Sequence, residues 1–454
     1  MTKATQFNMP LSEAARVLSV NFIGQDVLLN GVSTDTRSLS GGELFIALRG
    51  PNFDGHEFVA QAMEAGAVAV MVDHELDVAI PQLLVSDTRL AMGQLASAWR
   101  QRFTIPVFAV TGSNGKTTVK EMLASILSGL GEVHATRGNL NNDIGVPLTL
   151  FKLGEQHTSA VIEMGANHLG EIAYLVGLAK PDVAIITNAA AAHLEGFGSL
   201  EGVARAKGEI YAGLANDGTA IVNADDKFAP LWREIIKPRK KIEFGIEQAC
   251  DVSAKFAPTL KGNETLIKTP AGEMTINLPL LGQHNVMNAL AATAAVLAAD
   301  VSLTVVQQGL EKMQAVPGRL QAKSGVHASR IIDDTYNANP ASVSAAIRVL
   351  QGFAGDHFLA LGDMGELGSG EEALHRQVGC EARQQGVDRL YTIGELAKYA
   401  ADEFGEQACS FDNHEAMVAA LKEDLHQEAT LLVKGSRRMH MERVVEALTL
   451  EKGV

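Results

Sequence analysis

The sequence predicts an α/β protein with three domains, which we expect to span residues 1–103, 104–314 and 315–454. Two observations predict this fold class. Short apolar runs, typical of buried strands, alternate with helix-like stretches through the second and third spans. This alternation indicates parallel sheets covered by helices on both faces. The chain of 454 residues, 46% of them hydrophobic, is also long enough for about three domains with large cores.

The first span is expected to form a small mixed domain. Its strand-like runs are "ELFIAL" (43–48), "AVAVMV" (67–72) and "QLLVSD" (82–87). A helix-like stretch after His56 lies between the first two runs. A second stretch, "RLAMGQLASAWRQRF", leads to Pro106, which marks a boundary between domains.

The second span alternates regularly between strand-like and helix-like stretches. Its strand-like runs are "PVFAV", "SAVIEM" (159–164), "DVAIIT" (182–187) and "TAIVNADD" (219–226). Residues 250–280 differ, because "DVSAKFAP", "ETLIKT" and "MTINLPL" resemble a short antiparallel insertion with Gly-Asn and Ala-Gly turns. The alanine-rich "NALAATAAVLAAD" that follows is typical of a buried helix.

The third span repeats the alternation and predicts a second doubly wound, Rossmann-like sheet. Its strand-like runs are "RIID", "HFLALG", "RLYTIG" and "TLLVKG", with helices expected between them. One of these helices is expected to begin at Pro340. Asn339 before it is a favoured capping residue, and proline is favoured in the first helical position.

Composition and charge narrow the classes of function. The formal net charge of −15, from 53 acidic and 38 basic residues, argues against broad binding to nucleic acid or to anionic membranes. Cys250, Cys380 and Cys409 are far apart, which suits a reducing compartment better than a disulfide framework. The first twenty residues lack the apolar core of a signal peptide, and no run reaches the roughly 18 apolar residues of a membrane span. We therefore expect a cytoplasmic protein without a membrane partner and, since the sequence carries no oligomer signal, a monomer.

The stretch "VTGSNGKTT" (110–118) predicts a nucleotide site with an unusual sequence motif. The usual pattern has a glycine five residues before Gly115, where this chain has Val110. A strand precedes the stretch and a helix follows it, so main-chain N–H groups and the positive end of a helix dipole converge on one point. Lys116 adds a charge for terminal phosphates, and Thr117 adds a hydroxyl for Mg²⁺. The helix is expected from its apolar face: Val119, Met122, Leu123, Ile126, Leu127 and Leu130.

The short form Thr-Gly-x-x-Gly-Lys-Thr resembles the Mur ligase family, and the resemblance extends along nearly the whole chain. Further motifs similar to those of the family follow in its usual order: "GNLNNDIGVP" (138–147), "VIEMGANHLGEI" (161–172), "NAAAAHLEGFGS" (188–199), "ARAKGEIY" (204–211), "VNADD" (222–226), "GQHNVMNALAA" (282–292), "PGR" (317–319) and "DDTYNANP" (333–340). "STDTRSLSGGELFIALRGPNFDGHEF" (33–58) and "LGDMGELG" (361–368) resemble the branch that adds D-alanyl-D-alanine.

The resemblance implies an ATP-dependent ligase that joins D-alanyl-D-alanine to UDP-N-acetylmuramoyl-tripeptide through an acyl phosphate, in peptidoglycan synthesis. The three spans would then be a UDP-substrate domain, a central ATP-binding domain and a C-terminal ligase domain. ATP and two Mg²⁺ ions are the implied cofactors. Three alternatives stay open: a ligase that adds a single amino acid, a P-loop kinase or GTPase, and a nucleotide-sensing module without enzymatic activity. The third residue of the tripeptide, lysine or diaminopimelate, is also open.

The resemblance assigns the metal and catalytic roles to Lys116, Glu163, His193 and Lys207, with Thr117 as a further metal ligand. Glu163 ends a strand expected to lie beside the strand of the phosphate loop, where a carboxylate reaches the ligand cleft. His193 follows the strand "DVAIIT" and resembles the second metal ligand. On the sequence alone Lys207 is a solvated helix residue. The resemblance instead implies that CO₂ carbamylates it, giving a carboxylate that helps to hold the second Mg²⁺.

By this resemblance, nucleotide contacts are also expected from the phosphate loop, from Asn288 and from two residues of the third domain. The loop residues involved are Thr111, Gly112, Ser113, Asn114, Gly115, Lys116, Thr117 and Thr118. Arg319 and Asp334 would contact ATP from the third domain, Asp334 near the ribose. Asn288 would contact the nucleotide, although capping of a helix is an alternative role. The basic group Lys434, Ser436, Arg437 and Arg438 could meet the carboxylate of the dipeptide or form a solvated face.

The substrate residues are expected in two polar clusters. The family uses the region of Ser33, Thr34, Asp35 and Arg37 for the uridine diphosphate end of the substrate, although such clusters are also ordinary turn chemistry. Asn139, Asn141 and Asn142 form an amide-rich loop that could donate to a pyrophosphate or acyl group. The motif does not rank the three amides, and we assign Asn139 and Asn142 to substrate binding.

Overall fold

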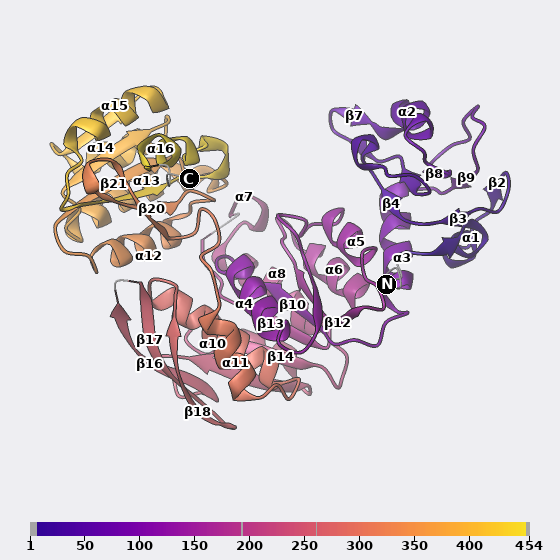
Figure 1. Cartoon of the computed structure of the whole chain (residues 1–454), viewed down its shortest axis with the longest axis horizontal. Coiled ribbons are helices and arrows are strands. Elements are labelled where there is room, and N and C mark those ends of the chain that lie inside the picture. Colours follow the sequence, from indigo (N-terminus) through magenta and orange to yellow (C-terminus); the bar gives the residue numbers. More distant parts are fainter. Residues whose placement is uncertain (1–6, 192–193, 260, 451–454) are drawn as a thin grey trace.

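The structure of the protein is a computed structural model that describes residues 7–191, 194–259 and 261–450. It is an α/β protein of three domains, which confirms the predicted fold class. Figure 1 shows the second domain between the first and the third. The residue limits predicted for the three domains stay predictions. No described helix is both long enough and apolar enough to cross a membrane.

The first domain contains a five-stranded sheet in the order β2-β9-β8-β5-β4, of which β9, β8, β5 and β4 are parallel. All three strand-like runs form strands, although shorter ones than predicted. The elements of the domain are β1 (Met9–Pro10), α1 (Leu11–Leu18), β2 (Phe22–Ile23), β3 (Leu28–Leu29), β4 (Val32–Ser33), β5 (Leu44–Ile46), β6 (Arg49–Gly50), β7 (Phe53–Asp54), α2 (Val59–Glu64), β8 (Ala69–Val72), β9 (Gln82–Leu84) and α3 (Thr88–Arg100).

The second domain contains a nine-stranded sheet in the order β11-β12-β10-β13-β14-β15-β16-β17-β18. Its strands are β10 (Val107–Thr111), β11 (Glu132–Ala135), β12 (His157–Glu163), β13 (Val183–Ile186), β14 (Thr219–Asn223), β15 (Lys240–Gly245), β16 (Val252–Thr259), β17 (Gly262–Thr269) and β18 (Gly272–Leu278). The pairing is parallel as far as β16 and antiparallel from β16 to β18, as the sequence predicts. The antiparallel strands extend the same sheet, and the predicted Gly-Asn turn is wrong because β17 already begins at Gly262.

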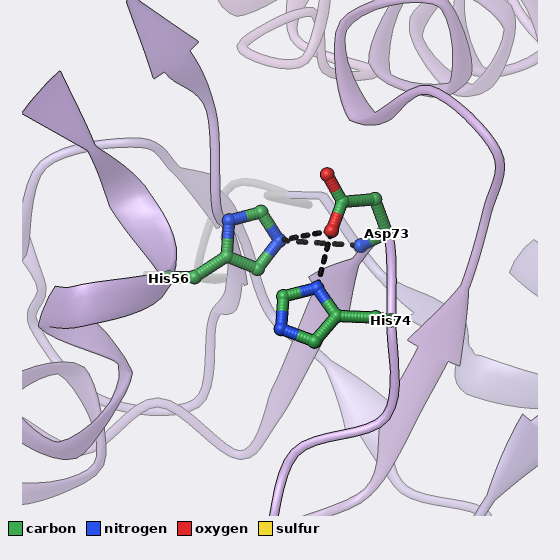
Figure 2. Close-up of side chains that lie close together, drawn as sticks. All are labelled: His56, Asp73 and His74. Atoms are coloured by element: carbon green, nitrogen blue, oxygen red, sulfur yellow. Dashed lines mark hydrogen bonds and ion pairs between the residues drawn. The ribbon is translucent and has the colours of Figure 1, made fainter.

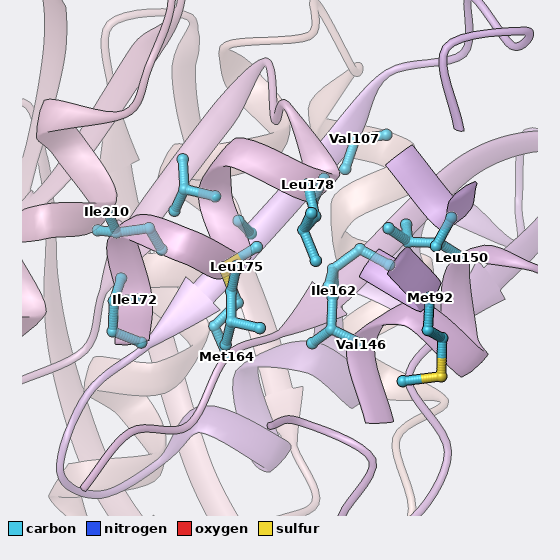
Figure 3. Packing of buried hydrophobic residues seen from close by; sticks show 14 of the residues in the cluster. Met92, Val107, Val146, Leu150, Ile162, Met164, Ile172, Leu175, Leu178 and Ile210 are labelled. Carbon is cyan, nitrogen blue, oxygen red and sulfur yellow. The ribbon is translucent and has the colours of Figure 1, made fainter. Parts of the chain in front are cut away.

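Helices cover both faces of this sheet and give it two cores. One core contains α5 (Gly145–Leu150), α6 (Glu171–Ala179), α8 (Leu200–Ala212) and α9 (Ala229–Ile236), and it continues into the first domain through α3. Figure 3 shows this packing, with Met92 of α3 near Val146 and Leu150 of α5. Because α3 shares the core of the sheet, the first and second domains are joined by apolar packing as well as by the chain.

The opposite face carries α4 (Lys116–Leu127), α10 (Gln283–Leu297) and α11 (Leu303–Glu311). The predicted apolar face of α4 is buried except for Leu130, which lies beyond the end of the helix and is 54% exposed. The small side chains of α10 let it pack closely against both the sheet and α4, which lies beside it on the same face, and this confirms the predicted buried helix. A short helix, α7 (Leu194–Phe197), lies before α8.

The third domain is the predicted doubly wound sheet, with order β19-β20-β24-β21-β22-β23 and only β19 antiparallel among its described strands. Asn339 caps α12 as predicted: its side-chain oxygen accepts from Ser342 N–H at 2.9 Å. The elements are β19 (Gln321–Ser324), β20 (Arg330–Asp334), α12 (Pro340–Leu350), β21 (Asp356–Gly362), α13 (Glu371–Gln384), β22 (Arg389–Ile393), α14 (Ala397–Phe404), β23 (Ala408–Phe411), α15 (His414–Asp424), β24 (Ala429–Lys434) and α16 (Glu442–Leu448).

Candidate functional site

A cavity of about 590 Å³ lies between the second and third domains. The second domain contributes the loop after β10, the end of β12, Lys207 of α8 and the beginning of α10. The third domain contributes Val316, residues 318–320, the end of β20, the beginning of α12 and Lys434. The cavity lies at the carboxyl ends of parallel strands, where open α/β sheets bind ligands.

The loop after β10 turns tightly into α4, and glycine is required at two of its positions. Gly112 has φ +149° and Gly115 has φ +83°, and the latter is a left-handed conformation that other residues adopt only at a cost. A Cβ on Gly115 would also lie 2.4 Å from Oδ1 of Asn288. The loop thus brings the N-terminus of α4 against α10. Val110, where the usual motif has a glycine, lies inside β10, so the turn begins only after it.

Lys116 lies at the first position of α4 and turns back over the loop. Its ammonium donates to Gly112 O at 2.7 Å and to Ser113 O at 3.4 Å. Burial lowers the pKa of Lys116, and the nearby carboxylate of Glu163 opposes that shift. The ammonium is therefore held at the mouth of the loop, where a phosphate would meet it.

Glu163 lies at the end of β12, opposite Val110 of β10, as the parallel sheet predicts. Its side chain is buried, and Oε1 accepts from Asn141 Nδ2 at 2.8 Å. Oε2 is also buried but has no hydrogen-bonding partner in the part of the chain that the structure describes. A buried carboxylate oxygen without a partner is costly, so this atom suits a cation that the chain itself does not supply.

The amide-rich loop is arranged differently from the prediction. Asn141, which the motif did not rank above its neighbours, contacts Glu163, whereas Asn139 is exposed and does not line the cavity. Asn142 lines the cavity, and its Oδ1 accepts from Gly145 N–H at 2.8 Å. The three amides lie in the loop between β11 and α5, and the path of this loop, which a sequence pattern does not give, directs Asn141 rather than the other two at Glu163.

Lys207 is 1% exposed inside α8, so its interpretation as a solvated helix residue is wrong. Burial and the charge of Lys116 lower its pKa to about 7, so its amine is neutral in a large fraction of molecules at neutral pH. The nitrogen lies 5.5 Å from the centre of the Phe197 ring. His193, predicted beside it, lies outside the described residues.

Two predicted nucleotide contacts come from the third domain. Arg319 donates to Thr117 Oγ1 at 3.1 Å, and its guanidinium lies 4.3 Å from the centre of the Tyr336 ring. Asp334 accepts from Lys434 Nζ and from Leu320 N–H, the latter at 3.2 Å. Burial raises the pKa of Asp334, and the Lys434 charge opposes that shift.

The residues of the basic group at the end of β24 differ in their exposure. Lys434 is 2% exposed and paired with Asp334, so it belongs to no solvated face. The side chains of Arg437 and Arg438 are 63% and 60% exposed, as a solvated face would be. Ser436 is buried, and its hydroxyl has no partner among the described residues.

Asn288 lies within α10, facing the loop, and does not cap the helix. The capping position of α10 is Gly282, and Asn288 donates from Nδ2 to Asn285 Oδ1 at 3.1 Å. The alternative capping role is therefore wrong. His284, one turn earlier on the same helix, also lines the cavity, and burial lowers its pKa to about 4.

The remaining substrate residues lie in the first domain, away from the cavity. Ser33 contacts Ser38 Oγ at 2.9 Å and donates to Asp35 O at 3.0 Å, and Asp35 pairs with Arg37 at 2.7 Å. Hydrogen bonds from Arg37 lower the pKa of Asp35 to about 2. Thr34 lies within the same turn. These contacts match ordinary turn chemistry, and the substrate role of the cluster stays a prediction.

His56, Asp73 and His74 form a second cluster with metal-ligand chemistry, in the first domain (Figure 2). Their candidate ligand atoms lie within 4.8 Å of one another. However, His56 contacts Asp54 through Nδ1 at 2.6 Å, and its Nε2 accepts from Asp73 N–H at 3.2 Å. Arg49 pairs with Asp73 at 2.8 Å and with Asp54 at 3.1 Å. Both ring nitrogens of His56 are engaged and a cation is already present, so this is an ion-pair cluster.

Comparison with known proteins identifies the arrangement. Residues 28–100 match the model of the Mur ligase family, catalytic domain, residues 110–296 match the Mur ligase middle domain, and residues 318–437 match the Mur ligase glutamate ligase domain. The UDP-N-acetylmuramoyl-tripeptide--D-alanyl-D-alanine ligase of Escherichia coli K12 is 46% identical over 97% of this chain and 98% of its own. The ligase of that name from Haemophilus influenzae is 42% identical over 96% and 97%.

Solved structures agree over the same length. A crystal structure of MurF from Acinetobacter baumannii has a TM-score of 0.93 at 38% identity, covering 97% of this chain and 99% of that one. MurF from Thermotoga maritima in complex with ADP has a TM-score of 0.83 at 27% identity, covering 92% and 96%. With three domain matches in order and relatives that are similar from end to end, the chain belongs to the Mur ligase family.

Proposed function

We propose that this chain is an ATP-dependent ligase that joins D-alanyl-D-alanine to UDP-N-acetylmuramoyl-tripeptide, forming the pentapeptide precursor of peptidoglycan with release of ADP and phosphate. The curated relatives that carry this name match nearly the whole chain. The observation that carries the proposal is the cavity in which the phosphate loop faces Arg319 and Asp334 of another domain. A simple P-loop kinase or GTPase does not need these third-domain side chains.

The reaction balances within this cavity. A carboxylate oxygen of the tripeptide attacks the γ-phosphorus of ATP, and ADP leaves. The amine of the dipeptide attacks the acyl carbon and loses a proton, and phosphate leaves with the former carboxylate oxygen. Lys116 and Arg319 stabilise the negative charge that gathers as these bonds change, because cations in a site with little water act strongly on transition-state charge. The walls from two domains keep water from the acyl phosphate.

We propose that Thr117, Glu163, His193 and a carbamylated Lys207 would hold Mg²⁺. The unpartnered Oε2 of Glu163 and the buried amine of Lys207 support this set, because a carboxylate and a carbamate are hard oxygen ligands. Bound Mg²⁺ would neutralise phosphate charge and polarise the γ-phosphate. A neutral amine reacts with CO₂, and the pKa of about 7 for Lys207 makes that form available at neutral pH.

We also propose a division of labour between the domains: residues 1–103 bind the UDP end of the substrate, residues 104–314 bind ATP, and residues 315–454 close over it. Ser33, Thr34, Asp35, Arg37, Asn139 and Asn142 are the proposed substrate contacts. The reaction uses UDP-linked precursors and ATP, so we propose that it takes place in the cytoplasm and that the active species is a monomer.

The test is an ADP-release assay in which each substrate is omitted in turn, with mass spectrometry of the product. ADP should accumulate only when both the UDP-tripeptide and D-alanyl-D-alanine are present, and the product should have the mass of the pentapeptide. Parallel reactions with the lysine and diaminopimelate tripeptides identify the accepted third residue. Efficient ligation of a single amino acid in place of the dipeptide would contradict the proposal.

A further inference from the structure

Two hydrogen bonds join the phosphate loop to the third domain in the described parts of the chain. One is the Arg319–Thr117 contact at 3.1 Å. The other runs from Asn339 Nδ2 to Asn114 Oδ1 at 2.8 Å. They differ in what a bound nucleotide would do to them. Thr117 is the hydroxyl proposed for Mg²⁺, so Arg319 competes with the metal for it, whereas the Asn339–Asn114 bridge does not involve the proposed metal ligands.

Asn339 is held in one orientation by the helix that it caps. Its Oδ1 accepts from Ser342 N–H at 2.9 Å, and its own N–H donates to Ser342 Oγ at 3.0 Å, which together form a capping box. Because the cap occupies Oδ1, the amide nitrogen must face away from α12 and toward the loop. Asn339 is 9% exposed, so water competes little for that nitrogen.

Asn114 is equally constrained from the other side. Its N–H donates to Asn188 Oδ1 at 3.0 Å, and its carbonyl accepts from Thr187 Oγ1 at 2.6 Å and from Asn188 Nδ2 at 3.1 Å. The main chain of Asn114 is thus engaged with the loop after β13, and only its side chain reaches the third domain. Asn114 therefore connects the phosphate loop both to the loop after β13 and to α12 of the third domain.

We infer that Asn339 is a positioning residue for the reaction: its amide fixes the N-terminus of α12 against the phosphate loop, so that the third domain stays aligned with the nucleotide when Arg319 leaves Thr117. The kinetic part of this inference rests on the proposed function. The structural part does not, because the bridge joins the two domains whatever the reaction is.

The test separates the bridge from the cap. Asn339→Ser keeps a favoured capping oxygen but is too short to reach Asn114, and Asn114→Ala removes the acceptor. Asn413→Ser is the matched control, because Asn413 caps α15 of the same domain through Ala416 N–H at 2.8 Å and is itself exposed. A buried neutral hydrogen bond is worth on the order of 1 kcal/mol, which corresponds to roughly a fivefold change.

We expect Asn339→Ser and Asn114→Ala each to lower kcat/KM for ATP by roughly three- to tenfold, while Asn413→Ser changes it less than about twofold. The double variant should be no less active than the less active of the two single variants, because both changes remove the same hydrogen bond. Asn339→Ser should melt below Asn413→Ser by no more than the loss of one hydrogen bond explains, since both keep a cap. Multiplying effects in the double variant would overturn the inference, as would unchanged kcat/KM in both single variants.

A second measurement needs no ligase activity. Spin labels at exposed Cys409 of the third domain and at Lys255→Cys of β16, with Cys250 and Cys380 replaced by serine, report the distance between the domains. We expect one narrow distance distribution for the unsubstituted pair and a broader one in both bridge variants, without added ligand. An unchanged distribution in folded Asn114→Ala protein would overturn the inference, even if Asn339→Ser failed to fold. Absence of pentapeptide in the unsubstituted protein would instead count against the proposed function.

Discussion

At the scale of single residues, the buried amine of Lys207 shows how far a sequence pattern carries. Its neighbours in α8 include Arg205 and Glu209, so the local pattern is that of an exposed helix. The burial of Lys207 depends on packing between α8 and segments distant in the sequence, which hydrophobic periodicity does not report. Only the resemblance of "ARAKGEIY" to the family motif placed this lysine in the site.

The first prediction is that activity depends on a carbamate at Lys207. Removing CO₂ and bicarbonate at mildly acidic pH should lower activity measured at neutral pH, and added bicarbonate should restore it. The amine must be neutral to react, so recovery should slow as pH falls below the pKa of about 7. Lys207→Arg should not recover, because a guanidinium keeps its charge and offers no oxygen ligand. Full activity of Lys207→Ala at limiting Mg²⁺ would contradict the prediction.

At the scale of elements, the turn from β10 into α4 depends on Gly115, and a second glycine provides a matched control. Gly115 and Gly170 both precede a helix, with φ +83° and +87°. A Cβ at Gly170 meets nothing within 4 Å, whereas one at Gly115 lies 2.4 Å from Asn288 Oδ1. The two alanine variants therefore share the backbone strain and differ in the contact with α10.

We predict that Gly170→Ala loses about 1–2 kcal/mol in the free energy of unfolding, because a left-handed alanine is strained. Gly115→Ala should lose at least as much, because its Cβ also meets Asn288. Only Gly115→Ala should weaken ATP binding, since it displaces Asn288 at the cavity. Urea denaturation and calorimetric titration with a non-hydrolysable ATP analogue measure the two effects. Equal ATP affinity in the two variants would show that the contact with Asn288 does not position the loop.

The parallel strands β11 and β12 carry a buried histidine pair that predicts a pH dependence of stability. His134 lies on β11 and His157 on β12, with ring centres 4.9 Å apart. Burial lowers the pKa of His134 to about 4, and it also lowers the pKa of His157. In the unfolded chain both histidines have a pKa near 6.5, so below that pH the folded state binds fewer protons than the unfolded state. Stability should therefore fall as pH falls from about 6.5 toward 4.

His134→Gln is the variant that tests this dependence. Its amide can still donate to Thr149 O, which His134 contacts through Nε2 at 2.7 Å. The full pKa shift of His134 corresponds to about 3 kcal/mol in the free energy of unfolding. Between pH 7.5 and pH 4.5 the unsubstituted protein should therefore lose more stability than the variant, which lacks this titrating group. Denaturation in urea at both pH values gives, for each protein, the change in the free energy of unfolding between pH 7.5 and pH 4.5. The same change in the variant and in the unsubstituted protein would contradict the assignment of this pH dependence to His134.

Much of the fold could be predicted at this scale, and the exceptions have physical reasons. Alternating apolar runs predicted the parallel sheets, and Asn339-Pro340 predicted the start of α12. Leu130 was wrongly placed on the face of α4 because the heptad-like spacing continues after the helix ends at Leu127. Asn141 could not be separated from Asn139 and Asn142, because the choice depends on which amide the turn directs at Glu163.

At the scale of the whole molecule, the third domain already contacts the phosphate loop, whereas the proposed UDP contacts of the first domain lie away from the cavity. A substrate held at both places must span the gap or draw the first domain closer. We predict that an ATP analogue alone leaves the radius of gyration nearly unchanged and that adding the UDP-tripeptide reduces it. Small-angle scattering measures this, with calorimetry to establish that both ligands are bound. An unchanged radius with both ligands bound would argue against closure.

The central claim is that this cavity joins a carboxylate to an amine through an acyl phosphate. A reaction with UDP-N-acetylmuramoyl-tripeptide labelled with ¹⁸O in its terminal carboxylate, together with ATP and D-alanyl-D-alanine, tests it most directly. If ATP activates the carboxylate, one labelled oxygen moves to the released phosphate for each pentapeptide formed, and mass spectrometry of that phosphate detects it. Pentapeptide formed with unlabelled phosphate, or ADP released without pentapeptide, would contradict the account.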